Sequence, residues 1–303
     1  CKQEIKEFIQ VDAKVSSQVL EVEVSKEQLN ILVTKCQSAR RILVAMSQVD
    51  SLEKISFSNL EVFESGKSLK LVVENVQGQE NRLKIAKEVA SQLFSDLKKK
   101  NLNLQLDLKK PDYKVVVWKD ANYYIGLDQA GEMNAREYRV FAHSATFKGD
   151  ASYFIVRYSQ YKPGEKLLIG YSKDGSIAIE AARFSKSEVK AFDESRQNIT
   201  AARKNSTIAG VQVDYQRYSL EELDTRFDKG EFDKVIFHIT KKDEQALNEL
   251  YYQVKYILKR KSIAVFITRP TWDMSVSDAF ELIEKKELPI GHSSHTLWKL
   301  KKK

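Results

Sequence analysis

The chain has 303 residues, of which 42% are hydrophobic and 30% are charged, and its formal net charge is +8. This length exceeds one ordinary domain, and the composition excludes a disordered chain, so two or three folded domains are expected. No apolar run reaches the roughly 20 residues of a membrane-spanning helix, and the two cysteines have no paired spacing, so we expect a cytoplasmic protein without a membrane partner, a disulfide framework or a bound metal.

The first 131 residues predict a small mixed α/β region. Apolar spacing predicts a helix over residues 4–9, a strand over 18–24 and a longer helix over 26–46. A strand over 67–76 and a helix over 79–100 follow. Alternating apolar residues then predict strands over 102–108, 113–120 and 122–131. The part from 67 to about 131 is therefore expected to be rich in antiparallel strands.

Residues from about 147 onward alternate between apolar strands and helices. Strands are expected at 166–171, 187–193, 211–218, 232–239 and 262–270, with helices at 174–184, 195–210 and 243–260. Residues 288–300 predict a closing hairpin. Buried strands that alternate with helices are typical of a largely parallel, doubly wound sheet.

The join between these regions, residues 126–168, resembles the domain junction of THUMP-domain RNA methyltransferases. That family carries Gly-x-x-Leu-x-x-Arg-x-Tyr-Arg at this place, followed by His-Pro-Ala-Ser-Leu-x-Gly. Ser144 stands where the family has proline, and Thr146 stands where it has serine. The matching positions are Gly131, Met133, Arg136, Tyr138, Arg139, His143, Ala145, Phe147 and Gly149.

The resemblance implies an α/β and α+β multidomain fold. It implies a ferredoxin-like domain over residues 1–62, a THUMP RNA-binding domain over 63–131, a linker over 132–146 and a Rossmann-like, doubly wound methyltransferase domain over 147–303. It also implies that the front half binds structured RNA, typically the acceptor end of tRNA.

Several side chains suit that RNA-binding role. Tyr113, Tyr123 and Tyr124 could stack on unpaired bases, or they could pack within strands. For Arg40 and Arg41 the alternative is a helix C-terminus, which favours cations. The residues expected to contact phosphates are Arg40, Arg41, Lys109, Lys110, Lys114, Arg136, Arg139 and Lys148.

The loop that binds S-adenosylmethionine in this family reads Asp-Pro-x-Cys-Gly-Ser-Gly-Thr. At the corresponding place this chain has Gly170, keeps the second glycine of the loop as Gly175, and has Ser176 in place of threonine. Ile169 replaces the acid and Lys173 replaces the first glycine. A lysine cation near the sulfonium of the cofactor opposes binding, so this cofactor-binding site is expected to be vestigial.

Two further strand ends carry the remaining chemistry of the family. Asp193 stands where an acid holds the ribose hydroxyls, although it could instead cap the following helix. The catalytic strand of the family ends in Asn/Asp-Pro-Pro-Tyr/Phe, whose polar groups and aromatic ring hold a flipped base. The residues at those four places here are His238, Ile239, Thr240 and Lys241, so no catalytic residue is expected.

Losses at both loops favour a pseudo-enzyme. We expect an RNA-binding protein, with tRNA as its RNA, whose methyltransferase domain is inactive and binds either no cofactor or S-adenosylmethionine. Two alternatives stay open: an active S-adenosylmethionine-dependent tRNA guanosine N2-methyltransferase, and the RNA-binding subunit of a heteromeric methyltransferase. A protein partner or a homo-oligomer is compatible with these readings. Metal binding by His292 and His295 in the predicted hairpin is disfavoured.

Overall fold

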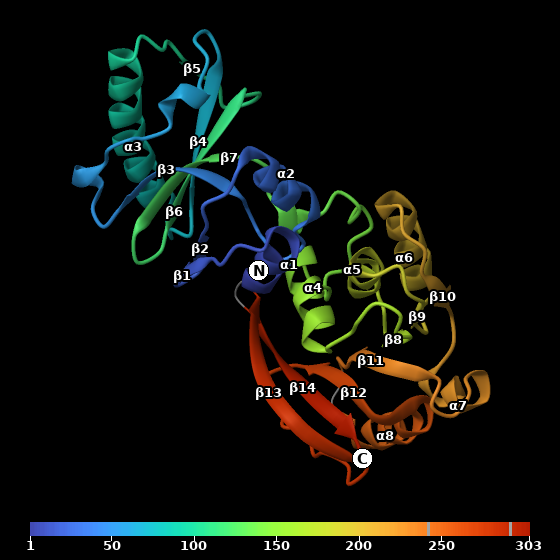
Figure 1. The fold of residues 1–303 in the computed structure, drawn as a ribbon. Coiled ribbons are helices and arrows are strands. Elements are labelled where there is room, and N and C mark those ends of the chain that lie inside the picture. The colour runs from blue at the N-terminus through green and yellow to red at the C-terminus, as the bar shows by residue number, and fades with distance from the viewer. Residues whose placement is uncertain (241–242, 291–292) are drawn as a thin grey trace. The chain divides into compact units, whose positions relative to one another are not determined.

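The computed structural model describes residues 1–240, 243–290 and 293–303 (Figure 1). The chain divides into two compact units, unit 1 (Cys1–Met133) and unit 2 (Asn134–Lys303), and each is described by itself. No helix in the described part of the chain is long and apolar enough to cross a membrane.

Unit 1 consists of a small α/β segment followed by a larger sheet. In the first segment a core forms between α1 and α2, where Ile5 and Ile9 share a cluster with Leu32. The elements of unit 1 in chain order are α1 (Lys2–Ile9), β1 (Lys14–Ser16), β2 (Val19–Glu21), α2 (Lys26–Lys35), β3 (Leu43–Val49), η1 (Leu52–Lys54), η2 (Leu60–Val62), β4 (Ser68–Glu74), α3 (Gln79–Lys99), β5 (Gln105–Leu106), β6 (Tyr113–Lys119) and β7 (Tyr123–Asp128).

The helix predicted over residues 26–46 is wrong in its second half, because α2 ends at Lys35 and the chain then enters β3. The carboxylate of buried Glu4 accepts hydrogen bonds from the backbone N–H groups of Gln37 (2.9 Å) and Ser38 (3.0 Å), and these contacts turn the chain away from the helix. β3 then pairs antiparallel with β7. Periodicity alone does not distinguish a short buried helix segment from a short buried strand.

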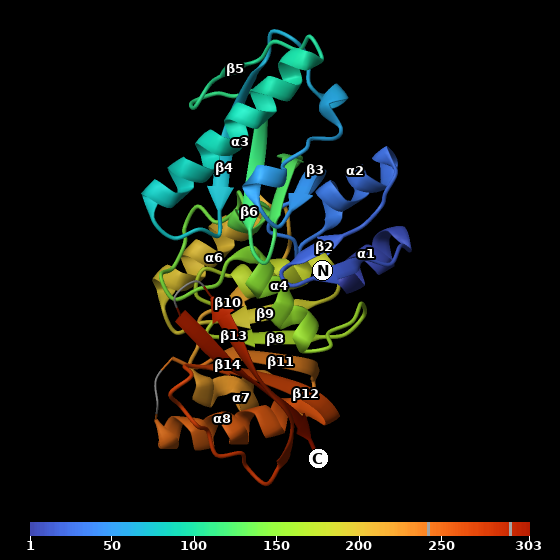
Figure 2. The ribbon, with the colours of Figure 1, turned by 90° about the vertical axis from the view of Figure 1, so that its left-hand side faces the viewer.

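The sheet of unit 1 has the strand order β3-β7-β6-β4-β5. It is mixed, since β4 runs parallel to both β5 and β6, while β7 runs antiparallel to β3 and β6. The strand predicted over 102–108 is only the two residues of β5. Figure 2 shows α3 lying along one face of this sheet, where Val89, Leu93 and Leu97 recur every four residues and are fully buried.

Unit 2 is the alternating α/β region that the sequence predicts. η3 (Met133–Ala135) lies at the division between the units. The elements that follow are α4 (Gly149–Tyr158), β8 (Leu167–Gly170), α5 (Ser176–Phe184), β9 (Val189–Phe192), α6 (Arg196–Ala209), β10 (Asp214–Gln216), η4 (Leu220–Glu222), α7 (Leu223–Arg226), β11 (Phe232–His238), α8 (Glu244–Ile257), β12 (Leu258–Thr268), β13 (Phe280–Ile290) and β14 (Ser293–Lys302).

The sheet of unit 2 has the order β10-β9-β8-β11-β12-β14-β13, and its first five strands are parallel. The two faces of this sheet carry separate cores. Leu167 and Ile169 of β8 pack under α4, α5 and α6, whereas Leu168 between them packs on the face of α7 and α8. This is the doubly wound, Rossmann-like arrangement predicted from the alternation of strands and helices (Figure 1).

The strand order of this sheet reverses between β8 and β11. In open α/β sheets, ligands bind at such a switch point, beyond the carboxyl ends of the strands. The turn after β8 and the residues after β11 meet at this place. Residues 171–176 and His238 are therefore the candidates for a ligand-binding site in this fold.

Candidate functional site

The turn after β8 has an unusual backbone. Tyr171, Lys173 and Gly175 have positive φ angles of 57°, 51° and 81°. Glycine is required at position 175, because a Cβ atom there would lie 2.5 Å from the Tyr215 hydroxyl oxygen and 2.9 Å from the Ala202 Cβ. Each of the two non-glycine residues in this conformation costs roughly 1–2 kcal/mol. Contacts around the turn must therefore stabilise it.

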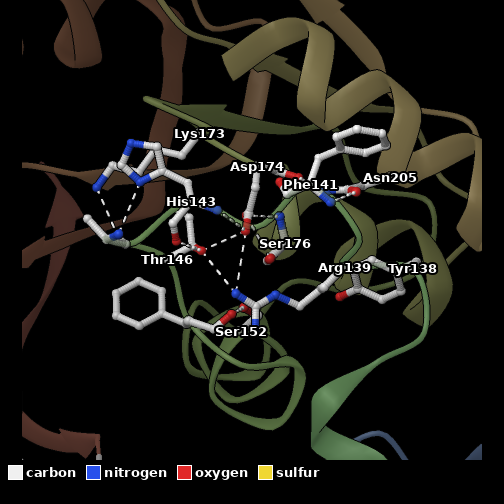
Figure 3. Close-up of polar contacts among 12 residues, drawn as sticks. Tyr138, Arg139, Phe141, His143, Thr146, Ser152, Lys173, Asp174, Ser176 and Asn205 are labelled. Atoms are coloured by element: carbon white, nitrogen blue, oxygen red, sulfur yellow. Dashed lines mark hydrogen bonds and ion pairs between the residues drawn. The ribbon is translucent and has the colours of Figure 1, made fainter. Parts of the chain in front are cut away.

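Asp174 is fully buried at the centre of these contacts (Figure 3). Its Oδ2 accepts hydrogen bonds from the Thr146 hydroxyl (2.6 Å) and from the His143 backbone N–H (3.2 Å). Its Oδ1 accepts hydrogen bonds from the backbone N–H (3.1 Å) and the hydroxyl (2.7 Å) of Ser176. The Arg139 guanidinium lies 3.5 Å from the same carboxylate. One side chain thus connects the segment before α4 to the first residue of α5.

Lys173 projects inward from the turn and is only 7% exposed. Its Nζ donates hydrogen bonds to the Ala145 carbonyl oxygen (3.2 Å) and to Nδ1 of His238 (3.0 Å). Burial lowers the pKa of Lys173 to about 8, and the carboxylates of Asp193 and Asp174 partly oppose this change. The ammonium group is therefore bound inside the domain by groups of this chain.

His238, the last residue of β11, is neutral at this site. Burial, and then the neighbouring Lys173 cation, hold its pKa well below the usual value. Its ring stacks on Phe147, with the ring centroids 4.8 Å apart, and its centroid lies 5.7 Å from that of His295. Burial also lowers the pKa of His295. Because Nδ1 of His238 already accepts a hydrogen bond from Lys173, that nitrogen is not available to a substrate.

Little space remains between these side chains. The cavity beneath the turn has a volume of about 10 Å³, and its walls include Phe147, Ile169, Lys173 and His238. That volume admits about one water molecule, whereas pockets for cofactor-sized ligands measure roughly 300–1,000 Å³. The cavity beneath the turn therefore has no room for a ligand of cofactor size.

Asp193 follows β9 and is also satisfied by its own chain. Its Oδ1 accepts hydrogen bonds from the Ser195 backbone N–H and the Asn198 side-chain amide, both at 2.9 Å. Its Oδ2 accepts the Lys173 backbone N–H at 2.9 Å. Asp193 is buried, so this carboxylate links the turn after β8 to the first turn of α6.

The three described places of the catalytic motif, residues 238–240, show no grouping of acceptors. The backbone N–H of Ile239 donates to the Ile267 carbonyl oxygen at 2.9 Å, and Thr240 is exposed. Lys241 lies outside the described residues, as does His292. Within the described ranges, no group of three or more His, Cys, Asp or Glu residues is arranged to hold a metal ion.

The sequence profile of the RMKL-like methyltransferase domain matches residues 136–298, which is more than half of the chain. The chain belongs to this family. Among solved structures, TrmN from Thermus thermophilus is similar over 99% of this chain and 95% of its own, with a TM-score of 0.74 at 17% identity. SMU.472, solved as a complex with SAH, is similar over 98% of this chain and 94% of its own, with a TM-score of 0.74 at 14% identity.

A third similar structure is a predicted N6-adenine-specific DNA methylase from Listeria monocytogenes. It covers 98% of this chain and 91% of its own, with a TM-score of 0.71 at 11% identity. At such low identities these likenesses show a shared fold and no more. No curated protein matches this chain in sequence. The family and the fold thus agree on a methyltransferase-like domain for unit 2.

The segment that begins unit 2 contacts a buried carboxylate, Glu180, that the sequence analysis did not identify. Glu180 on α5 is fully buried and accepts hydrogen bonds from the Arg136 guanidinium (2.8 Å) and the Tyr138 hydroxyl (2.7 Å). Burial, followed by the nearby Glu180 charge, raises the pKa of Tyr138. A glutamate within the apolar run of α5 could have indicated this cluster, because a buried carboxylate requires polar or charged partners.

Three of the arginines predicted to contact phosphate are engaged within the fold. The Arg41 guanidinium binds Glu74 (3.0 Å) and Asp128 (2.7 Å), and its side chain is 11% exposed. Arg136 binds Glu180, and Arg139 contacts Thr146 and Asp174, as described above. The alternative interpretation, that Arg40 and Arg41 lie at a helix C-terminus, is wrong because α2 ends at Lys35.

Other predicted phosphate contacts do reach the surface. Lys109 and Lys110 are exposed between β5 and β6, and Lys148 is exposed before α4. Arg40 is exposed over about half of its side chain and lies over the Trp118 ring, 5.3 Å from its centroid. Lys114 is partly exposed, and its Nζ lies 4.0 Å from the Asp128 carboxylate.

The three candidate stacking tyrosines are occupied to different degrees. Tyr124 is buried, and its hydroxyl hydrogen-bonds with that of Ser16 at 2.7 Å. Tyr113 packs edge-on against Phe63, with centroids 5.1 Å apart. Tyr123 is partly exposed beneath the Lys119 ammonium, 4.5 Å from its ring centroid. Strand packing accounts for the first two, and Tyr123 keeps accessible ring surface.

Proposed function

We propose that this protein binds RNA, with tRNA as its target, and that its methyltransferase-like domain does not transfer methyl groups. The observation that carries the proposal is the position of Lys173, whose ammonium fills the site beneath the turn and leaves a cavity of about 10 Å³. The commitment of Asp193 to three donors of the chain itself supports the same conclusion.

Exposed cations support the RNA-binding part of the proposal. Arg40, Lys109 and Lys110 are accessible in unit 1, and the whole chain carries a net charge of +8. The resemblance of the junction to THUMP-domain methyltransferases supports a THUMP-type RNA-binding domain over residues 63–131, after a ferredoxin-like domain over 1–62. Binding of structured RNA through phosphate contacts needs such cations on an accessible surface.

The first test is isothermal titration of the full chain with S-adenosylmethionine and with SAH, beside gel-shift assays with tRNA. We expect no heat at millimolar ligand and a clear shift of tRNA. Binding of either ligand in the micromolar range would overturn the inactive assignment. Lys173→Gly is the informative variant, because a gain of SAH binding in it alone would identify the lysine as the block.

A matched pair of charge reversals tests the RNA surface. Lys109→Glu with Lys110→Glu is expected to weaken tRNA binding about tenfold at physiological salt, since two phosphate contacts would become repulsive. Lys162→Glu with Lys186→Glu makes the same change of net charge at two exposed lysines of unit 2 and is expected to have little effect. Equal losses in both pairs would show that net charge alone drives binding.

An active methyltransferase is the second candidate function. Gly175, Ser176 and Asp193 persist, and the turn keeps its left-handed backbone at positions 173 and 175. Transfer of radiolabelled methyl groups from S-adenosylmethionine to tRNA by the full chain, abolished in Gly175→Ala, would establish this candidate.

A further inference from the structure

A second and much larger cavity opens on the surface of unit 2 beside α6. Its volume is about 340 Å³, which lies in the range of ligand pockets. The described residues that line it differ from those that line the closed cavity beneath the turn, so the two cavities are separate. In the view of Figure 3, Phe141 and Lys173 lie on opposite sides of Asp174. The residues that line the larger cavity are Phe141, Arg196, Gln197, Thr200, Ala201 and Lys204.

Phe141 is an exposed aromatic residue with a fixed backbone. Its N–H donates to Oδ1 of Asn205 at 3.1 Å, and its carbonyl oxygen accepts from Nδ2 of the same residue at 3.3 Å. Asn205 is fully buried and also donates to the Asp174 carbonyl oxygen at 2.9 Å. Phe141 nevertheless remains 42% exposed. The fold thus holds an apolar ring at the surface instead of burying it.

Two cations of α6 line this pocket together with the ring. Arg196, Thr200 and Lys204 are spaced four residues apart and share one face of α6. The Lys204 ammonium lies 4.7 Å from the centroid of the Phe141 ring. Among the residues that the structure describes, no carboxylate forms an ion pair with Arg196 or Lys204. Their positive charge is therefore available to an external anion.

We propose that this pocket binds one unpaired nucleotide of an RNA, with the base stacked on Phe141 and the adjoining phosphates bound by Lys204 and Arg196. This inference rests on the proposed RNA-binding function. Aromatic rings next to cations are the usual means of binding single-stranded nucleic acid, because every base has a face that stacks. Gln197 and Thr200 add polar groups within reach of the edge of a base. An acidic peptide would use the two cations but has no need of the ring.

The test uses the full chain and a short single-stranded RNA that carries 2-aminopurine, whose fluorescence falls when it stacks on an aromatic ring. Phe141→Leu is expected to weaken binding about tenfold and to abolish the fluorescence change. Lys204→Gln is expected to lower the salt dependence of log K by about 0.7, the loss of one phosphate contact on a single strand. Tyr252→Leu and Lys186→Gln alter an exposed aromatic residue and an exposed lysine elsewhere in unit 2, and serve as controls.

The outcomes separate this inference from the function on which it rests. Equal behaviour of the Phe141 and Tyr252 variants, or failure of the oligonucleotide to bind while tRNA binds, overturns the pocket alone. Failure of both RNAs to bind overturns the proposed function and the pocket together. Displacement of the oligonucleotide by poly-glutamate, with no fluorescence change on binding, overturns the pocket in favour of an acidic protein partner.

Discussion

Each of two cavities of unit 2 is lined by a lysine and an aromatic ring, which are buried in one cavity and exposed in the other. Beneath the turn after β8, Lys173 meets a histidine and a phenylalanine, and its ammonium is bound by the Ala145 carbonyl and His238. Beside α6, Lys204 meets Phe141, and both side chains face solvent. The first cavity measures about 10 Å³ and the second about 340 Å³.

The difference between the two cavities lies in whether the chain itself supplies the partners of the cation. A buried cation requires hydrogen-bond or charge partners. When the chain itself supplies them, the cation needs no contact from a ligand. An exposed cation beside an exposed ring can still form such contacts with a ligand. The proposed loss of one site and use of another are compatible with a preserved fold, because function depends on sites more than on folds.

Removal of Asp174 should break the closed region most severely. Asp174→Ala leaves the donors of Thr146, His143 and Ser176 without their acceptor in a buried place, so we expect the free energy of unfolding to fall by about 3–5 kcal/mol. Urea unfolding followed by tryptophan fluorescence measures this loss. Asp214→Ala, at an exposed position on β10, is the control and should change stability by less than about 0.5 kcal/mol. A loss below about 1 kcal/mol in Asp174→Ala would contradict the central role of this carboxylate.

A matched pair of glycine substitutions sharpens the account of the turn. Gly175→Ala forces a Cβ to within 2.5 Å of the Tyr215 hydroxyl oxygen at φ +81°, and we expect a loss of about 3 kcal/mol from backbone strain and overpacking together. Gly164→Ala has a similar φ of +90° but no atom within 4 Å of the new Cβ. Backbone strain alone then predicts a loss of about 1 kcal/mol. Equal losses in urea unfolding would show that the close approach of α6 to the turn is unimportant.

The titration of Lys173 offers a third test of the closed cavity. Because burial lowers its folded pKa to about 8, from an ordinary value near 10.5, the folded state binds fewer protons than the unfolded state between these two values. The free energy of unfolding should therefore rise with pH in that window, by about 2 kcal/mol between pH 8 and pH 10. Lys173→Met removes this group, and the difference between the two chains isolates it, since tyrosines titrate in both. A constant difference across the window would mean that the ammonium is solvated.

The sequence predicts the order of strands and helices from β8 to β12, because apolar strand runs alternate there with helical ones. The helix predicted over 243–260 is wrong at its end, since α8 stops at Ile257 and β12 begins at Leu258, and most of β13 (Phe280–Ile290) was not predicted. The sequence also fails at the end of α2, where a hydrogen-bonded carboxylate from Glu4, distant in the sequence, decides the local structure. Such long-range contacts leave no trace in the periodicity of a segment.

For the candidate site, the sequence indicates which positions depart from the family pattern but does not show what the new residues contact. The replacement at Lys173 is visible in the sequence, whereas its hydrogen bond to His238, 65 residues away, is not. Arg136 and Arg139 were predicted to contact phosphate, but in the structure their guanidinium groups pair with the buried carboxylates of Glu180 and Asp174. The Phe141 pocket depends on Asn205, which no motif identifies.

The smallest expected effect concerns the open cavity. Arg196→Gln and Lys204→Gln should each leave the free energy of unfolding unchanged within about 0.5 kcal/mol, because neither cation pairs with a described carboxylate. Arg139→Gln should cost about 1–3 kcal/mol, since its guanidinium lies beside buried Asp174. Urea unfolding of the three variants measures the contrast directly. A stability loss at Lys204 as large as at Arg139 would show that this cation serves the fold, and would contradict the argument that it is free to bind an external anion.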